Sequence, residues 1–441
     1  MTYDYKSIWR ISLPILVSQL LVQLINVTDV IFLGHVSTVA VGAAGLSGIY
    51  FFALFMLFAG FGFGAQIIMS RRNGEKNYRN IGAVLYQGTF FLLLFALFII
   101  VLSYFVSPHI LRHMISDDKV YQSALTYLNW RIFGLIVAAF LVMIRAFFVA
   151  IAQTFVLQLI SVAMVFFNVI LNYIFIFGFK CIPALGIKGA AIASVTSEFL
   201  AILVGIIYLV ITVDLEKYGL KTFVYKNFAL LKSILKLSVW TMLQQFVSIG
   251  TWFLFFAAVE HLGTNELAIS NILRNSAGIP WIAVVAFATA AGTITGNLIG
   301  EGRQNEVLKA SRKIIFLNTS VLLTLLIVFA IFYYPILRIY TNNTTLIRLA
   351  VVPYFSGLLC YFPLFSGMIW FQNVSATGNT KYSMFIEFVA MIFYTIFIGI
   401  FIYHLKVPLY ICMFSDGIYN LILFIMSHHF MHSLKWLNKQ V

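Results

Sequence analysis

The chain has 441 residues, of which 62% are hydrophobic and only 10% are charged, and its formal net charge is +14. Soluble proteins carry about 25% charged residues, so this composition excludes a soluble globular protein and predicts a polytopic membrane protein. The positive charge could indicate a nucleic-acid partner, but in membrane proteins Lys and Arg accumulate in cytoplasmic loops. The three cysteines, Cys181, Cys360 and Cys412, lie far apart and suggest neither a disulfide framework nor a metal cluster.

Twelve apolar segments are long enough to cross a bilayer as helices, each of which needs about 20 residues. We expect these spans at residues 11–33, 44–69, 82–106, 123–148, 155–178, 188–213, 236–259, 267–297, 312–336, 349–375, 383–404 and 407–430. The first segment is of full length and carries an acidic residue, so no cleavable signal peptide is expected. The predicted fold class is an all-α membrane protein with twelve transmembrane helices.

The distribution of Lys and Arg predicts the orientation of these spans. With the N-terminus placed in the cytoplasm, 19 of the 28 basic residues fall in cytoplasmic segments and seven in external ones, while Arg131 and Arg274 lie within spans. This bias predicts that both termini are cytoplasmic. It also accounts for the positive charge without nucleic acid.

The two halves of the chain resemble each other at an offset of 226 or 227 residues. The matched stretches are Gly34-His-Val-Ser-Thr with Glu260-His-Leu-Gly-Thr, Asn73-Gly-Glu-Lys with Gly300-Glu-Gly-Arg, and Ala152-Gln-Thr with Gly378-Asn-Thr. We therefore expect an N-lobe over residues 1–213, a cytoplasmic connector over 214–235 and a C-lobe over 236–441. Because six spans are an even number, the two lobes form parallel repeats, with a substrate cleft between them and alternating access by rocking.

Asp29, inside the first span, is the most informative residue of the chain. A carboxylate at the centre of a membrane helix costs about 2.5–3.5 kcal/mol and by default indicates an ion or substrate pathway. In the fifth span, Asn168 and Asn172 are four residues apart and share one helical face. Ser194 and Glu198 have the same spacing in the sixth span. At a rise of about 1.5 Å per residue, these polar groups reach similar depths in the outer half of the membrane.

Two kinds of coupling chemistry fit this cluster. A carboxylate surrounded by amide and hydroxyl oxygens suits a hard cation such as Na⁺. A carboxylate in an apolar setting is equally a proton carrier. The structural alternative is that Asp29 only holds helices together by hydrogen bonds to Asn26, Asn168 or Asn172. Glu198 either belongs to the same pocket or faces another helix.

Five stretches match a known family: Ser12-Leu-Pro-Ile, Val27-Thr-Asp-Val-Ile-Phe-Leu-Gly, Asn168-Val-Ile-Leu-Asn-Tyr-Ile-Phe-Ile-Phe-Gly, Gly186-Ile-Lys-Gly-Ala-Ala-Ile-Ala-Ser and Gly300-Glu-Gly-Arg. Through them the chain resembles the multidrug and toxic compound extrusion (MATE) transporters over essentially its whole length. The resemblance implies a MATE-like fold and a cation-coupled antiporter that expels amphipathic, often cationic, compounds.

The resemblance also implies roles for individual residues. Asp29 matches the cation-binding aspartate of the N-lobe, with Asn168 and Asn172 beside it and the hydroxyl of Ser194 one helix later. Pro14 matches a proline at which the first helix can bend, because proline removes a helical hydrogen bond.

The second lobe departs from the NorM-like branch of the family. The positions that are acidic there in spans seven and ten look like Ser248 and Ser366 here, so coupling is placed at Asp29. Gln244, like its neighbour Gln245, is a candidate for substrate contact, with helix packing as the alternative.

Three further polar residues lie in or near spans of the second lobe. Asp416, in the twelfth span, has no obvious partner in the sequence and is a candidate for cation or substrate binding. Glu387 is interpreted as interfacial, near the cytoplasmic end of span eleven. Arg274 is expected to pair with a buried acid rather than to repel cationic substrates.

The functional prediction is a Na⁺- or H⁺-coupled exporter of drugs or toxic organic compounds, and not an enzyme. No Walker A pattern is present, so ATP is not the expected energy source. We expect a monomer in a bacterial plasma (inner) membrane, without a cofactor, a resident metal or a nucleic-acid partner. Its partners would be small amphipathic substrates, the coupling cation and the bilayer. The alternative, a flippase for lipid-linked oligosaccharides, needs several basic residues in its cavity. A non-transporting scaffold is disfavoured by the repeated bundles.

Overall fold

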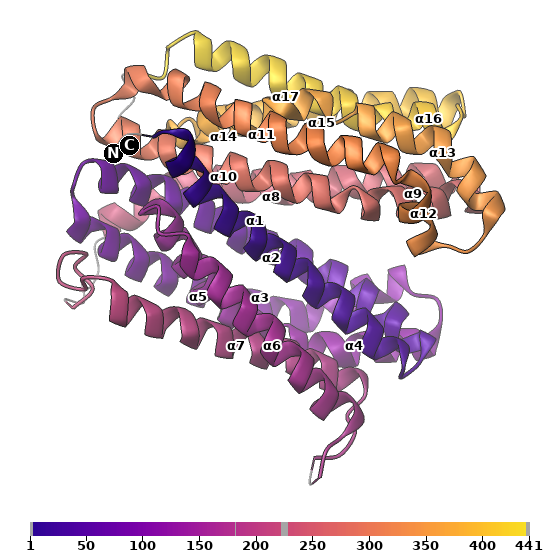
Figure 1. Ribbon diagram of the computed structural model, residues 1–441. Coiled ribbons are helices and arrows are strands. Elements are labelled where there is room, and N and C mark those ends of the chain that lie inside the picture. Colours follow the sequence, from indigo (N-terminus) through magenta and orange to yellow (C-terminus); the bar gives the residue numbers. More distant parts are fainter. Residues whose placement is uncertain (1–2, 181, 222–227, 438–441) are drawn as a thin grey trace. The chain divides into compact units, whose positions relative to one another are not determined.

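The computed structural model describes residues 3–180, 182–221 and 228–437, and the regular secondary structure of these residues is helical (Figure 1). Cys181 and part of the expected connector, residues 222–227, lie outside the described residues. The helices group into two compact units. Unit 1 comprises Met1–Ser12 and Leu243–Val441, and unit 2 comprises Leu13–Met242.

Unit 2 holds most of the first helix and ends within the eighth. Its helices are α1 (Tyr5–Gly34), α2 (Thr38–Gly74), α3 (Tyr78–Met114), α4 (Asp118–Arg131), α5 (Gly134–Ala150), α6 (Phe155–Phe177), α7 (Ile187–Thr212) and the first part of α8 (Phe228–Glu260). Within this unit α6 and α7 lie side by side (Figure 1). The N-terminus of α2 is capped by the hydroxyl of Ser37, which accepts from the amide of Ala40, and that of α4 by the carboxylate of Asp117.

Unit 1 contains the remainder of α8 and the shorter helices of the second half. These are α9 (Thr264–Ser276), α10 (Gly278–Gly300), η1 (Gln304–Glu306), α11 (Val307–Ile331), α12 (Tyr333–Tyr340), α13 (Thr344–Leu359), η2 (Phe362–Phe365), α14 (Gly367–Ala376), α15 (Thr380–Phe397), η3 (Ile398–His404), α16 (Leu409–Cys412) and α17 (Phe414–His432). Helix α17 packs against both α14 and α15 (Figure 1). Cys360 and Cys412 are buried free thiols in this unit.

Among the described residues, eleven helices are long and apolar enough to cross a membrane, or twelve if α4 and α5, bent by 48°, count as one span. This confirms the predicted all-helical membrane fold. The predicted spans 267–297 and 349–375, however, are not continuous helices. Pro280 cannot donate to the carbonyl of Ser276, where α9 ends, and Pro363 cannot donate to the carbonyl of Leu359, where α13 ends.

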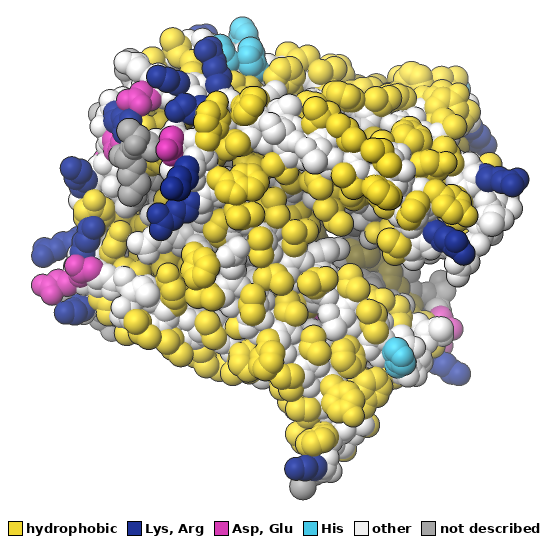
Figure 2. Space-filling view, in the orientation of Figure 1, with side chains coloured by type: hydrophobic (Ala, Val, Ile, Leu, Met, Phe, Trp, Pro, Cys, Tyr) yellow, Lys and Arg dark blue, Asp and Glu magenta, His cyan; other side chains and the backbone are white. Residues whose placement is uncertain are grey.

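The surface of the helices is apolar in a way that a soluble protein would not tolerate. Large side chains such as Tyr104, Ile211 and Phe105 are 72%, 76% and 63% exposed. In the view of Figure 2, hydrophobic side chains cover the flanks of the helices, whereas Lys and Arg gather near their ends. Exposed apolar surface of this extent indicates contact with lipid.

The start of α8 packs closely against α2 within unit 2. The hydroxyl of Thr241 donates to the carbonyl of Gly60 at 2.7 Å, and that of Ser238 donates to the carbonyl of Phe61 at 3.3 Å. A Cβ atom added at Gly60 would lie 2.5 Å from the Cα atom of Met242. Glycine therefore permits a backbone-to-backbone contact of the kind that stabilises membrane helix pairs.

We expect Gly60→Ala to destabilise the protein by about 1–3 kcal/mol, because the added methyl group overlaps backbone atoms that cannot rotate away. The control is Gly48→Ala on the same helix, where an added Cβ meets nothing within 4 Å. There the higher helix propensity of alanine should leave stability unchanged or slightly improved. Thermal unfolding of both variants in detergent measures the difference. Equal midpoints would refute the close contact.

Candidate functional site

The carboxylate of Asp29 on α1 receives hydrogen bonds from two other helices of unit 2. Oδ1 accepts from the amide nitrogens of Asn172 at 2.6 Å and Asn168 at 3.1 Å, both on α6. Oδ2 accepts from the hydroxyl of Ser194 on α7 at 3.2 Å. The structure thus brings together the four residues predicted for cation coupling, although their role in coupling stays a prediction.

Local sequence explains why α6 and α7 present these groups at one level. Asn168 and Asn172 are fully buried on one face of α6, and the amide nitrogen of Asn172 also donates to the amide oxygen of Asn168 at 3.0 Å. The two helices approach so closely that a Cβ at Gly189 would lie 2.2 Å from the carbonyl oxygen of Phe175. Small residues at such crossings permit close helix packing in membranes.

One acceptor in the site lacks a donor. The amide oxygen of Asn172 is buried and has no hydrogen-bond partner among the described residues. An unsatisfied buried oxygen is costly, and rotation of an asparagine side chain would exchange its nitrogen for its oxygen. With Asp29 and the hydroxyl of Ser194, such oxygens provide the ligand types of a hard cation. The same carboxylate can instead take up a proton.

Glu198 does not contact Asp29; it pairs with Arg131 at the end of α4. Two charge-assisted hydrogen bonds of 2.6 and 3.0 Å join the guanidinium to the two carboxylate oxygens. The guanidinium also lies 3.8 Å from the ring centroid of Phe51. A Cβ atom added at Gly134 would lie 2.3 Å from the Nη1 atom of Arg131. The absence of a side chain at Gly134 therefore leaves the space that this ion pair occupies.

Pro14 lies inside α1, which continues from Tyr5 to Gly34 without a break. As the residue lacks an N–H group, it cannot donate to the carbonyl of Arg10. The boundary between the two compact units falls after Ser12, two residues before this proline. Pro14 therefore lies two residues beyond the point at which α1 leaves unit 1 and enters unit 2. The hydrogen bond that proline removes weakens α1 at this place.

In unit 1 the remaining candidates are engaged with other partners. Gln244 is buried and its amide oxygen accepts from the hydroxyl of Ser383 at 3.3 Å. Asp416 accepts from Arg274 at 2.9 Å, and the same guanidinium nitrogen lies 3.3 Å from the hydroxyl of Tyr394. Arg274 thus pairs with an acid, as predicted, but the side chain of Asp416 is 32% exposed and not fully buried. Arg274 is also the partner of Asp416 that the sequence did not reveal.

Glu387, interpreted as interfacial from its place near the end of span eleven, is buried and only 1% exposed. Its carboxylate accepts hydrogen bonds from the hydroxyl groups of Ser248 and Tyr419. Ser383, Glu387 and Tyr394 recur on one buried face of α15, and this periodicity was the signal that sequence reasoning missed. Ser248, expected to replace an acid of the family, thus lies beside an acid that comes from another helix.

Comparison with known proteins supports the same fold and the repeat. A probable multidrug resistance protein NorM of Thermotoga maritima is 24% identical over 88% of this chain and 83% of its own length. The structure of a MOP superfamily transporter from Pyrococcus furiosus superposes with a TM-score of 0.89 at 19% identity, covering 99% of this chain and 97% of that one. The structure of a multidrug resistance MATE family transporter in an outward-facing conformation superposes with a TM-score of 0.88 at 19% identity. The match covers 98% of this chain and 96% of that one.

The family model described as MatE matches residues 14–174 and again residues 241–401. The start of the match shifts from 14 to 241, which is 227 residues, and its end shifts equally. This confirms the internal repeat expected from the short matched stretches. The two matches cover well over half of the chain, which therefore belongs to the MatE family of multidrug and toxic compound extrusion transporters.

Proposed function

We propose that this transporter is a Na⁺- or H⁺-coupled antiporter that exports amphipathic or cationic drugs and toxic organic compounds by alternating access, with coupling at Asp29. The observation that carries the proposal is the carboxylate of Asp29, which lies within a membrane-spanning helix and accepts hydrogen bonds from neutral donors of α6 and α7. An ionisable group in such a setting marks an ion pathway. The relatives described as multidrug resistance proteins support the substrate class.

Binding of either cation would change what holds α1 in place. A proton or Na⁺ neutralises the carboxylate, so the amides of Asn168 and Asn172 lose a charged acceptor and α1 loses its strongest contacts with α6. Pro14 weakens the same helix and allows it to bend. A cation that binds one arrangement of α1 more tightly than another shifts the population between the two.

The proposed transporter has both termini in the cytoplasm and lies in a bacterial plasma (inner) membrane. The excess of Lys and Arg in alternate loops supports cytoplasmic termini, and the bacterial origin of the NorM relatives supports a plasma (inner) membrane. The proposed transporter works as a monomer with N-lobe 1–213, connector 214–235 and C-lobe 236–441. It requires the bilayer, the coupling cation and its substrate, without nucleic acid or a cofactor.

Dye efflux from vesicles tests the coupling directly. We expect efflux to stop when one of the two gradients, Na⁺ or pH, is dissipated, and to continue when only the other is removed. The experiment thereby also identifies the cation. Vesicles from cells without the protein provide the background rate. Efflux that survives the loss of both gradients would refute the proposal.

The flippase alternative is less well supported. Two of the arginines within the expected spans, Arg131 and Arg274, are each paired with a carboxylate, Glu198 and Asp416 respectively, and are therefore less available to a pyrophosphate group. Asp29 would in addition repel an anionic lipid.

A further inference from the structure

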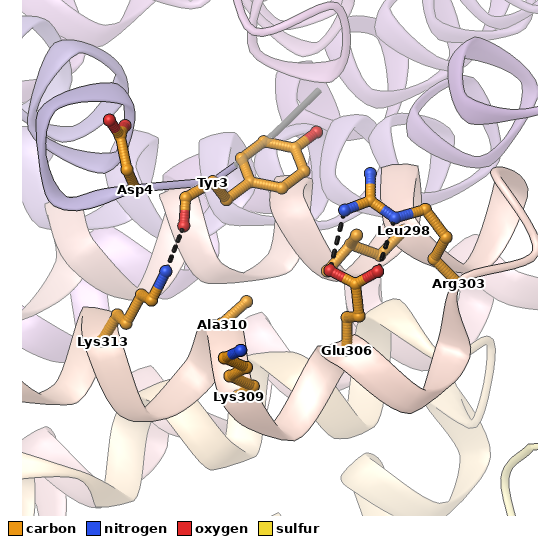
Figure 3. Close-up of a pocket in the computed structure, with 8 residues that line it drawn as sticks. All are labelled: Tyr3, Asp4, Leu298, Arg303, Glu306, Lys309, Ala310 and Lys313. Carbon is orange, nitrogen blue, oxygen red and sulfur yellow. Dashed lines mark hydrogen bonds and ion pairs between the residues drawn. The ribbon is translucent and has the colours of Figure 1, made fainter.

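A pocket of about 180 Å³ lies at one end of unit 1, where the N-terminal residues meet the turn between α10 and α11 (Figure 3). It is lined by Tyr3, Asp4, Leu298, Arg303, Glu306, Lys309, Ala310 and Lys313. Both α10 and α11 are candidate membrane spans, so the turn that joins them lies at a membrane–water interface. In the proposed orientation this is the cytoplasmic interface.

Two lysines form the cationic side of the pocket. Lys309 and Lys313 are four residues apart on α11, a spacing that places them on one side of the helix, and both line the pocket (Figure 3). The ammonium group of Lys313 donates to the carbonyl oxygen of Tyr3 at 3.1 Å, whereas that of Lys309 has no hydrogen bond to the other residues drawn in Figure 3. Two ammonium groups on adjacent turns suit a ligand with several anionic oxygens, such as a phosphate.

Arg303 has a different role from the lysines. Its guanidinium donates to both carboxylate oxygens of Glu306, at 2.8 and 2.7 Å, and to Glu301 at 2.6 Å. A guanidinium held by two carboxylates fixes the turn and has little remaining capacity for another anion. The lysines are therefore the groups of this pocket that are suited to an incoming phosphate.

The pocket also presents a carboxylate. Asp4 accepts from the amide of Ser7 at 2.8 Å and so caps the start of α1. These hydrogen bonds from Ser7 hold the pKa of the Asp4 carboxyl below its ordinary value, so it is ionised at neutral pH. Asp4 is exposed, whereas Tyr3 beside it is only 8% exposed. A ligand in the pocket thus meets positive and negative groups at once.

An apolar strip continues from the pocket along the lipid-facing side. Phe316, three residues after Lys313 on α11, is 60% exposed and packs edge-on against Tyr5 with ring centroids 5.7 Å apart. Tyr5 is itself 49% exposed, and one turn later Trp9 packs on Phe287. Aromatic side chains at this level are typical of the membrane interface. The charged groups of the pocket match the head group of a phospholipid, and the aromatic rings beside it match the start of the acyl chains.

We propose that this pocket binds the head group of a phospholipid that carries both a phosphate and a primary ammonium, of the phosphatidylethanolamine type. The phosphate lies at Lys309 and Lys313, the ammonium at Asp4, and the acyl chains along Tyr5 and Phe316. A purely anionic head group would meet the carboxylates of Asp4 and Glu306 unfavourably. A choline head group has no N–H with which to donate to Asp4. The bound lipid would brace the start of α1, the helix that carries Asp29, but its binding does not depend on the proposed function.

Native mass spectrometry of the full-length protein in detergent tests the proposal with phosphatidylethanolamine, phosphatidylcholine and phosphatidylglycerol carrying the same acyl chains. We expect phosphatidylethanolamine to be retained about fivefold more strongly than the other two, because one more charged contact forms. Lys309→Gln should weaken this lipid about fivefold. The control Arg312→Gln removes an exposed charge from the same helix outside the pocket and should change nothing.

A second variant tests the identity of the head group. Asp4→Asn keeps a side chain that can cap α1 but removes the charge. It should abolish the preference for phosphatidylethanolamine over phosphatidylglycerol. Equal retention of the three lipids by the wild type, a preference for phosphatidylglycerol, or an effect of Arg312→Gln as large as that of Lys309→Gln would overturn the proposal. Soluble phosphoethanolamine that bound as tightly as the lipid would overturn the assignment to a membrane lipid.

Discussion

Replacing Asp29 by Asn is expected to abolish cation-driven export while the protein stays folded and in the membrane. Asparagine has nearly the same shape and its amide oxygen can still accept from Asn172, but it can neither take up a proton nor neutralise Na⁺. Gradient-driven dye efflux from vesicles should therefore fall to the rate of vesicles without the protein. Immunoblotting of the same vesicles matches the amount of each variant.

Variants at neighbouring positions separate loss of coupling from general damage. Thr28→Val on the same helix removes a hydroxyl that donates to its own helix, to the Leu24 carbonyl at 2.5 Å, and should transport normally. Ser194→Ala removes a donor to the Asp29 carboxylate and should reduce coupling only in part. Ser197→Ala, whose hydroxyl donates to the Ser194 carbonyl, is its matched control. Full efflux by Asp29→Asn would remove the coupling assignment.

The largest expected loss of stability is at the ion pair of Arg131 and Glu198. The two side chains are only 13% and 17% exposed, and they lie 2.6 Å apart. Arg131→Met would leave the Glu198 carboxylate largely desolvated and without its counter-ion. Removing one partner of a buried pair costs about 3–5 kcal/mol. Unfolding of the purified variant in detergent, induced by heat or by denaturant, measures this loss.

Two further variants test whether burial causes the loss. The double variant Arg131→Met/Glu198→Leu removes both charges and should recover most of the stability, because apolar replacements of buried pairs are often neutral. Arg112→Met breaks an exposed pair with Asp118, in which the side chains are 52% and 80% exposed. Exposed pairs contribute about 0–1 kcal/mol. If Arg112→Met cost as much as Arg131→Met, burial would not explain the effect.

The Asp29 cluster could be predicted from the sequence because it depends on local rules. Spacing by four residues places Asn168 and Asn172 on one face of α6, and the rise per residue sets the depth of each polar group. The hydrogen bonds among Asp29, Asn172 and Ser194 required in addition only that the first, fifth and sixth spans be neighbours, which the family resemblance implied.

Glu198 shows where local rules were insufficient. It is four residues after Ser194, so its spacing suggested the same pocket, yet it pairs with Arg131, 67 positions earlier in the chain. The pair forms where α4 ends and the chain bends by 48° into α5. The missing side chain of Gly134 provides the space for it. No periodic pattern within one helix encodes such a contact.

The burial of Glu387 was the other feature that the sequence did not reveal. Its place near the cytoplasmic end of span eleven suggests an interfacial residue, but its carboxylate accepts hydrogen bonds from Ser248 and Tyr419 inside unit 1. The breaks after α9 and α13, in contrast, could have been predicted. Pro280 and Pro363 each remove the hydrogen bond to the residue where the preceding helix ends.

Cation release from the purified protein is the most direct test of coupling at Asp29. On addition of a transported dye, the wild-type protein should release bound H⁺ or Na⁺, detected with a pH indicator in weak buffer or with a Na⁺-sensitive probe. The Asp29→Asn variant should release neither, although Thr28→Val should behave as the wild type does. Equal release by the wild type and by Asp29→Asn would show that the exchanged cation is held elsewhere.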